Sequence, residues 1–264
     1  MFEVCSVSVI IPFFNASDTI ALSLRSVLKQ SLMPLEIIIV NDSSEHEEYM
    51  KLNAIVDGLD GSFLPISVYS IPENKGAAYC RNLAIKHAKG KYLAFLDSDD
   101  VWHCSKIKLQ YNFMEKNNCF LSGHGYIHNL KNKSFVEFDD VPVRLVKKYV
   151  FSYRNPFFTP TVMVVKNGFK GFDESFRRVD DYKCWLENFK EKRFFYLNEK
   201  LAGGFKSPIG ESGLTGSIVE MHKSYMLVLF SLYKEGYISR RFIFLSVSLE
   251  YIKYPLRLLL NIKQ

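Results

Sequence analysis

The sequence YLAFLDSDD, residues 92–100, decides the fold of this chain. Its first five residues are apolar and stop at Asp97, which is typical of a strand buried on both faces of a sheet. Three earlier strand-like runs have the same character, at residues 7–11, 36–40 and 66–71. Helix-like segments separate these runs. The alternation predicts an α/β fold with a mostly parallel central sheet and helices on both faces.

Polar residues follow three of these runs. The first run leads into Pro12 to Asn15, the second into Asp42, and the fourth into Asp97. In open parallel sheets, ligands bind beyond the carboxyl ends of the strands. We therefore expect these residues to meet at one edge of the sheet and to form a nucleotide site there.

Helix signals fill the gaps between the strands. One helix is expected to begin near Ser17 and Asp18, which can cap it. Another is expected over about residues 77–89, with Gly90 as the glycine that closes it.

The second part of the chain is less regular. We expect a strand at residues 161–165, a helix over residues 180–192 and a Gly- and Ser-rich loop at 203–216. From Phe242 onward, apolar residues recur every three or four positions, which predicts an amphipathic helix. Pro255 is expected to kink it.

Composition excludes several classes of protein. The 264 residues carry a net charge of +6 without a basic cluster, which argues against a nucleic-acid partner. The five cysteines lack the spacing of a zinc site or a disulfide framework, which favours a reducing, cytoplasmic environment. Neither a secretory signal nor a membrane-spanning apolar segment is expected.

The cluster at residues 97–100 holds three carboxylates in four positions. Such oxygens suit Mg²⁺ or Mn²⁺, and such an ion can bridge two phosphates and stabilise a leaving diphosphate. Taken alone, the cluster could equally be a solvated turn that caps the next helix.

Together with five further motifs, this cluster resembles the inverting family 2 glycosyltransferases. The resemblance covers about residues 7–187 and implies the GT-A fold, a Rossmann-like α/β domain. The C-terminal helical appendage that follows is expected from its own apolar periodicity. The motifs are VSVIIPFFN at 7–15, IVNDSS at 39–44, NKG at 74–76 with Arg81-Asn82, FLDSDD at 95–100, GFDE at 171–174 and DDY at 180–182.

The resemblance implies a nucleoside pocket at the first two strand ends. Pro12, Phe13 and Asn15 would line it, and Asp42 would accept the N3–H of a uracil or thymine ring. The plainer alternative for Asp42 is a helix cap.

The diphosphate and the donor sugar are expected further along the chain. The resemblance places Lys75 and Arg81 near the diphosphate, although Arg81 could also be a surface cation. It assigns Asp97 and Ser98 to the donor.

The same resemblance assigns the metal ion to Asp99, with Asp100 in support. It also places Trp102 near the acceptor, although ordinary packing explains that residue as well.

The resemblance places the catalytic base in the pair Asp180-Asp181, where the family usually has Glu-Asp. An inverting transferase needs one carboxylate to take the acceptor hydroxyl's proton. We expect Asp181 in that role, with Asp180 as its partner or as the base itself. The alternative is an acidic helix start that suits the helix dipole.

The motifs and the apolar pattern of the tail together predict a division of the chain. Residues 1–216 would form the catalytic domain, with a nucleotide-binding half to about residue 103 and an acceptor half over about 104–216. Residues 217–264 would form amphipathic helices that contact the inner face of the plasma membrane, pack on the domain or form a homodimer.

The expected function is transfer of one sugar, from a UDP-sugar, to a saccharide or polyprenyl-diphosphate-linked saccharide of a surface polysaccharide. A non-catalytic glycan- or membrane-binding protein on the same scaffold is the main alternative. A sugar-1-phosphate nucleotidylyltransferase is disfavoured, because residues 12–18 contain no glycine for a phosphate loop.

Overall fold

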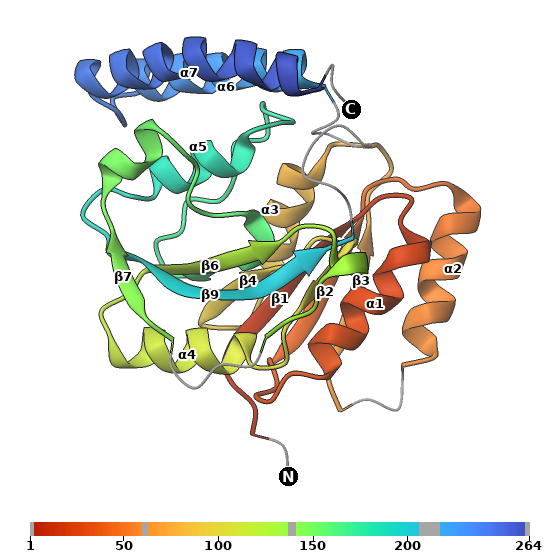
Figure 1. Ribbon diagram of the computed structural model, residues 1–264. Helices are drawn as coiled ribbons and strands as arrows, with labels where there is room; N and C mark the ends of the chain where they lie inside the picture. Colours follow the sequence, from red (N-terminus) through yellow and green to blue (C-terminus); the bar gives the residue numbers. More distant parts are fainter. Residues whose placement is uncertain (1–2, 60–62, 137–140, 206–216, 262–264) are drawn as a thin grey trace.

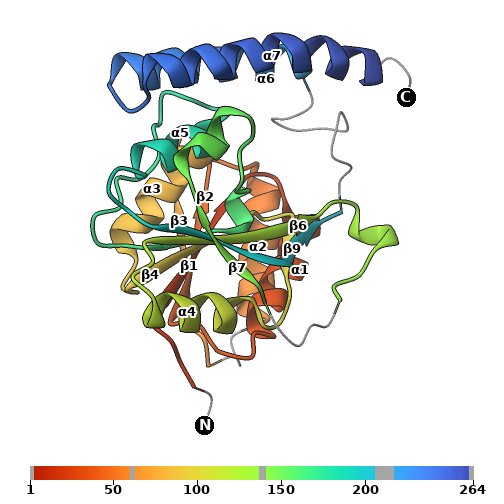
Figure 2. The same cartoon turned by 60° about the vertical axis from the view of Figure 1, so that its left-hand side comes forward.

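The computed structural model describes residues 3–59, 63–136, 141–205 and 217–261 (Figure 1). A nine-stranded sheet runs through the centre, and a pair of long helices lies at one end of the molecule (Figures 1 and 2). The strand order is β3-β2-β1-β4-β8-β6-β9-β5, and β7 pairs with β9.

The first half of the sheet is parallel, as the apolar runs predict. Strand β1 pairs with both β2 and β4, and β2 pairs with β3. This places the carboxyl ends of β1, β2 and β4 at one edge. The elements of this half are β1 (Val7–Phe13), α1 (Ser17–Leu28), β2 (Glu36–Asn41), α2 (His46–Asp57), β3 (Ile66–Ser70), α3 (Ala77–His87) and β4 (Tyr92–Phe95).

The second half of the sheet is mostly antiparallel. Strand β8 runs antiparallel to both β4 and β6, while β6 and β9 are parallel to each other. The long strand β9 also pairs with β5 and β7. These elements are β5 (Asp100–Trp102), α4 (Lys106–Lys116), β6 (Leu121–Ile127), η1 (Leu130–Asn132), β7 (Val143–Val146), η2 (Lys148–Ser152), η3 (Thr159–Thr161), β8 (Met163–Val165), α5 (Asp180–Glu187) and β9 (Phe194–Gly204).

Hydrophobic cores fill both faces of the sheet. Ile10 and Ile38 point into the core that α3 and α5 cover, while their neighbours Val9 and Ile37 point into the core beneath α1. All four side chains are at most 1% exposed. Apolar residues on both sides of one strand explain why these runs are continuous rather than alternating.

Several predicted ends differ from the structure. Helix α3 ends at His87, and Gly90 does not have a positive φ. Gly90 is needed for a different reason, since a Cβ there would lie 2.5 Å from the backbone nitrogen of Ser8. At the start of α1, Ser17 makes no capping bond within the helix. Its hydroxyl and backbone N–H donate to Glu48 instead.

The C-terminal appendage consists of α6 (Ile218–Lys234) and α7 (Arg240–Asn261), which lie side by side (Figures 1 and 2). Helix α7 continues through Pro255. Of the loop expected at residues 203–216, Gly203 and Gly204 belong to β9, and 206–216 lie outside the described residues. Within the described part of the chain, no helix has the length and apolarity to cross a bilayer.

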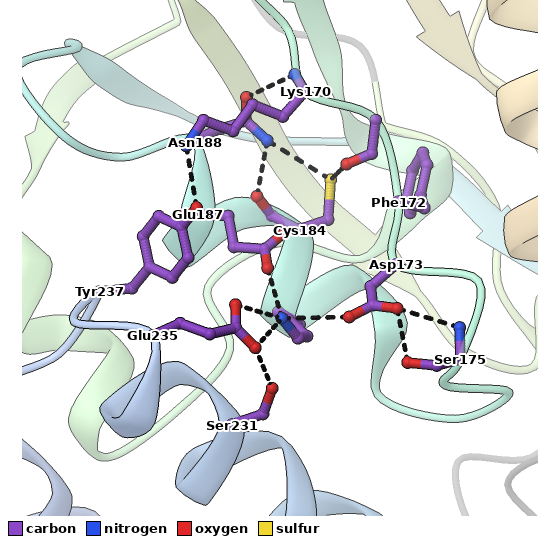
Figure 3. A network of polar contacts seen from close by, with 12 residues as sticks. Lys170, Phe172, Asp173, Ser175, Cys184, Glu187, Asn188, Ser231, Glu235 and Tyr237 are labelled. Atoms are coloured by element: carbon purple, nitrogen blue, oxygen red, sulfur yellow. Dashed lines mark hydrogen bonds and ion pairs between the residues drawn. The ribbon is translucent and has the colours of Figure 1, made fainter.

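A buried lysine joins the appendage to the sheet domain. Lys183 of α5 is 1% exposed, and carboxylates of Asp173, Glu187 and Glu235 converge on its ammonium group (Figure 3). Its Nζ lies 3.1 Å from Asp173 and 2.9 Å from Glu235, which is the C-cap of α6. The end of α6 is therefore joined to α5 by an ion pair with a buried lysine.

Candidate active site

Asp42 organises the edge of the sheet beyond β2. Its carboxylate accepts the backbone N–H of Lys75 at 2.7 Å and of Gly76 at 2.8 Å. The side chain is only 4% exposed. Asp42 therefore holds the loop before α3 against the strand end, and any contact of this carboxylate with a base would use its remaining lone pairs.

The end of β1 supplies a second polar group. Asn15 has a positive φ of 44°, its backbone N–H donates to Ser44, and its side-chain oxygen accepts the backbone N–H of Glu45. Pro12 is partly exposed beside it. Phe13 is fully buried in the core beneath α1, so its side chain supports this edge from below.

Arg81 joins the two acidic motifs. This side chain of α3 is 7% exposed, and its Nη2 donates to Asp97 Oδ1 at 2.7 Å. Its Nη1 lies 3.3 Å from Asp180 Oδ2. The alternative that Arg81 is a surface cation is therefore wrong. Arg81 connects the end of β4 to the start of α5.

The carboxylates of the acidic turn at residues 97–100, which follows β4, have different partners. Asp97 faces Arg81, while Asp100 is buried and accepts the hydroxyl of Tyr126 at 2.5 Å. Burial and the neighbouring carboxylate of Asp100 raise the pKa of Tyr126, so its proton stays in this bond. A Cβ on Gly204 would lie 2.3 Å from Asp100 Oδ1, so glycine is required there.

Asp99 lies partly exposed between these two paired carboxylates. Ser98 is also partly exposed, and its carbonyl accepts the hydroxyl of Ser23 at 3.0 Å. The turn offers hard oxygen ligands, which fits Mg²⁺ or Mn²⁺. Asp99 and Ser98 are the partly exposed residues of this turn next to the paired Asp97, so a metal ion could reach their oxygens.

A second cluster of carboxylates is unsuited to a metal ion. Among the residues that the structure describes, the only set of three ligand atoms close enough for one ion comes from Asp173, Glu187 and Glu235. The ammonium group of Lys183 occupies the centre of that set. These carboxylates are therefore paired with a lysine.

The start of α5 is strained. Val179 has a φ of 61°, in the left-handed region that β-branched residues rarely adopt. Asp180 and Asp181 follow at once as the first two residues of the helix. Strain of this kind costs about 1–3 kcal/mol and tends to persist where surrounding contacts hold a functional geometry.

Asp181 has the electrostatics of a base. Burial, followed by the nearby carboxylate of Asp180, raises its pKa to about 7. Hydrogen bonds from Asn155 Nδ2 at 2.9 Å and from the backbone N–H of Tyr182 at 2.7 Å oppose that rise. Burial also raises the pKa of Asp180, and Arg81 opposes that shift. A carboxylate with a pKa near 7 can take and hold a proton at neutral pH.

A cavity of about 510 Å³ opens beside these two aspartates. Its wall comes from the start of α5, the segment at residues 153–158 and both C-terminal helices. A cavity of this size accommodates a small saccharide or a comparable ligand. Asn155 and the cationic residues of this wall were not found from the sequence, because no motif or periodicity marks them.

Trp102 lies in the packed interior, and Lys75 lies at the surface. Trp102 is 4% exposed, its indole N–H donates to the carbonyl of Pro160 at 2.8 Å, and Lys106 Nζ lies 3.7 Å from its ring centroid. This is the packing role that the sequence left open. Lys75 is exposed on the loop held by Asp42, with its Nζ 4.8 Å from the ring centroid of Tyr79.

Comparison with known sequences identifies the family. The family model described as glycosyl transferase family 2 matches residues 8–200. The chain is 33% identical over 193 residues to WfgD of Escherichia coli, and the match covers 73% of each chain. That relative is named UDP-Glc:alpha-D-GlcNAc-diphosphoundecaprenol beta-1,3-glucosyltransferase.

Solved structures share the fold. S. aureus TarS 1–349 in complex with UDP-GlcNAc gives a TM-score of 0.66 at 19% identity, over 86% of this chain and 66% of that one. The mannosyltransferase PcManGT from Pyrobaculum calidifontis, in complex with GDP-Man and Mn²⁺, gives 0.67 at 13% identity, over 93% and 69%. The GT-A fold expected from the sequence is confirmed.

Proposed function

Because the chain belongs to glycosyl transferase family 2, we propose that it is an inverting enzyme of surface-polysaccharide assembly. It transfers one sugar from a nucleotide-sugar to a hydroxyl group of a glycan or of a lipid-linked saccharide. The observation that carries the proposal is Asp181, a carboxylate with a pKa of about 7 beside a cavity. A non-catalytic binding protein would have no need of such a group.

The proposed reaction is a single displacement. Asp181 accepts the proton of the acceptor hydroxyl while that oxygen forms a bond to the anomeric carbon of the donor. The bond from that carbon to the diphosphate oxygen breaks on the opposite side, so the configuration inverts. The hydrogen bonds from Asn155 and Tyr182 hold the carboxylate in place during the transfer.

The donor site in this proposal is the edge beyond β1, β2 and β4. Asn15 and Asp42 lie there at the two strand ends expected to hold the nucleoside, with Lys75 and Arg81 toward the diphosphate. A UDP-sugar is the proposed donor, and UDP-sugars are what WfgD uses by name and what TarS binds in its complex. Asp97 and Ser98 adjoin the donor sugar.

A divalent ion, Mn²⁺ or Mg²⁺, is the proposed cofactor. Asp99 would hold it, with Asp100 in support, and the ion would stabilise the charge that develops on the leaving diphosphate. The structure of PcManGT contains Mn²⁺.

The proposed acceptor is a sugar linked through a diphosphate to a polyprenol, as the name of WfgD states for that relative. Residues 1–216 form the catalytic domain in this view, and 217–264 form the appendage that adjoins a membrane at its inner face.

Helix α7 supports the membrane contact because it has polar residues on its buried face and apolar residues on its exposed face. Its buried face includes Ser246 and Glu250, at 1% and 5% exposure. Its outward face carries large apolar side chains that are 45–74% exposed, as expected for a helix that lies against lipid. They are Phe244, Leu245, Tyr251, Ile252, Leu256 and Leu259.

A sedimentation assay with anionic vesicles tests the membrane contact. Ile252→Glu should release the protein from the vesicles, while Met50→Glu, at an exposed apolar position of α2, should not. Light scattering gives the alternative: a stable dimer that ignores vesicles would mean that a second copy covers α7.

A transfer assay tests the chemistry. The purified chain should move sugar from one member of a nucleotide-sugar panel to octyl N-acetylglucosaminyl diphosphate in the presence of Mn²⁺. The anomeric configuration of the product, measured by NMR, should be opposite to that of the donor. Retained configuration, or no transfer from any donor, would overturn the proposal.

A further inference from the structure

The cavity beside Asp181 is rich in positive charge. Five cationic side chains line it, against three carboxylates. One of those carboxylates, Glu250, is already bonded by His222 at 2.9 Å and by Arg257. The cavity therefore suits an anion next to the proposed base. The cationic residues are Arg154, Arg177, Arg178, Lys253 and Arg257.

These cations come from different parts of the chain and meet only in the fold. Arg177 is already used structurally, because its guanidinium donates to the side chain and the carbonyl of Asn74 at 2.9 Å. Lys253 of α7 donates to the carbonyl of Tyr153, which joins the appendage to the segment that carries Arg154.

Arg257 carries an unsatisfied donor. Its Nη2 bonds Glu250, but its Nε is buried and has no hydrogen-bond partner among the described residues. The Arg257 side chain is 39% exposed, so the outer part of its guanidinium group can reach a ligand, and a phosphate oxygen is an acceptor that fits the planar fork of arginine.

The position of α7 adds a second constraint. Lys253 and Arg257 line the cavity, while Ile252 and Leu256, their neighbours in sequence, belong to the exposed apolar face. A ligand whose phosphates lie in the cavity would thus have an apolar surface directly beside it. Asp181, the proposed base for a sugar hydroxyl, lines the same cavity.

We propose that this cavity binds the diphosphate of the lipid-linked acceptor, with Arg154, Lys253 and Arg257 as its cationic ligands. The inference rests on the proposed function and names the diphosphate as the part of the acceptor that the enzyme binds. The sugar extends toward Asp181, and the lipid leaves along the apolar face of α7. The C-terminal helices are then part of the acceptor site.

Calorimetry with two acceptor probes tests this. Octyl N-acetylglucosaminyl diphosphate and uncharged octyl N-acetylglucosaminide are titrated with UDP and Mn²⁺ present, so that the donor site is filled. Arg154→Gln/Lys253→Gln should weaken binding of the diphosphate probe at least about ten-fold, because charge-assisted hydrogen bonds are lost. Binding of the uncharged probe should not change.

The matched control is Lys234→Gln/Arg240→Gln. It removes the same charge from exposed positions of α6 and α7 that do not line the cavity. Equal weakening in the control would show a general charge effect and overturn the proposal. So would unchanged binding in the test variant, or diphosphate binding that disappears when UDP is present.

Transfer kinetics separate this inference from the proposed function. If the wild type uses both probes with equal kcat/KM, the diphosphate site is wrong and the transferase proposal stands. If the diphosphate probe binds through Arg154 and Lys253 but no nucleotide-sugar supports transfer, the proposed function fails and the binding site stands.

Discussion

Asp97 and Asp180 accept hydrogen bonds from the same guanidinium group, that of Arg81, at 2.7 and 3.3 Å. Asp97 lies just beyond the end of β4 at the proposed donor site, and Asp180 begins the helix that carries the proposed base. One buried side chain therefore sets the distance between the two halves of the site.

Replacing Arg81 should cost both stability and activity. Arg81→Gln leaves two carboxylates without their cation, and breaking a buried ion pair costs about 3 kcal/mol. We expect a lower denaturation midpoint and a fall in kcat larger than the change in donor KM. Lys86→Gln, an exposed position on the same helix, is the control and should leave both unchanged. A stable and fully active Arg81→Gln variant would contradict the bridging role.

The base assignment predicts a large kinetic effect at one of two neighbouring aspartates. Asp181→Asn should lower kcat by about 10²–10⁴-fold, because the amide cannot accept the acceptor's proton. Donor affinity, measured by calorimetry, should change little. Asp180→Asn provides the comparison. A larger loss of kcat in Asp180→Asn than in Asp181→Asn would move the role of the base to Asp180.

The raised pKa of Asp181 predicts a pH dependence of the rate. Burial and the charge of Asp180 place this pKa at about 7. The base must be ionised, so kcat should rise with pH through about 7 and then level off. A rate that is flat between pH 5.5 and 8.5, with chemistry shown to be rate-limiting, would exclude Asp181 as the base.

Stability should change in the opposite direction. A carboxylic acid whose pKa is higher in the folded chain than in the unfolded chain favours folding while it is protonated. That contribution is present below the unfolded pKa of about 4 and is lost as pH rises through about 7. The melting temperature of the wild type should therefore fall more between pH 5 and 8 than that of Asp181→Asn. Equal falls would contradict the shifted pKa.

Asp99 and Asp100 are expected to separate metal binding from folding. Asp99→Asn should raise the Mn²⁺ concentration needed for half-maximal activity and lower kcat about a hundred-fold or more. Asp100→Asn weakens the bond to Tyr126 and should mainly lower the melting temperature, with a smaller rise in the Mn²⁺ requirement because Asp100 only supports the metal ion. If Asp99→Asn keeps the Mn²⁺ dependence of the wild type, the metal assignment fails.

The sequence alone predicted the parallel half of the fold well. Strands buried on both faces, such as Ile37 to Val40, leave a continuous apolar run, and the polar residue that ends each run marks the ligand edge. The acidic turn, Asp42 and the pair at the start of α5 all lie at that edge or beside it. The local sequence pattern is enough to predict a strand when both faces of that strand are buried.

The remainder of the site depends on contacts between distant residues. Nothing near Arg81 in the sequence signals Asp180, and Lys253 and Arg257 resemble ordinary cations on an amphipathic helix. Strand β8 has only three residues, which are too few to show a hydrophobic periodicity. Its antiparallel pairing with β4 therefore has no signal in the sequence. These features arise from tertiary packing.

Lys183 limits how this enzyme could be recombined with its relatives. Its ammonium group is shared between carboxylates of the sheet domain and Glu235 at the end of α6. A chimera that receives helices α6 and α7 from another family member must bring an acid at position 235, or Lys183 loses one of its three carboxylate partners and the ion pair that joins α5 to α6. To exchange the acceptor preference of this chain, the C-terminal helices would thus have to be replaced together with the segment that contains residue 183.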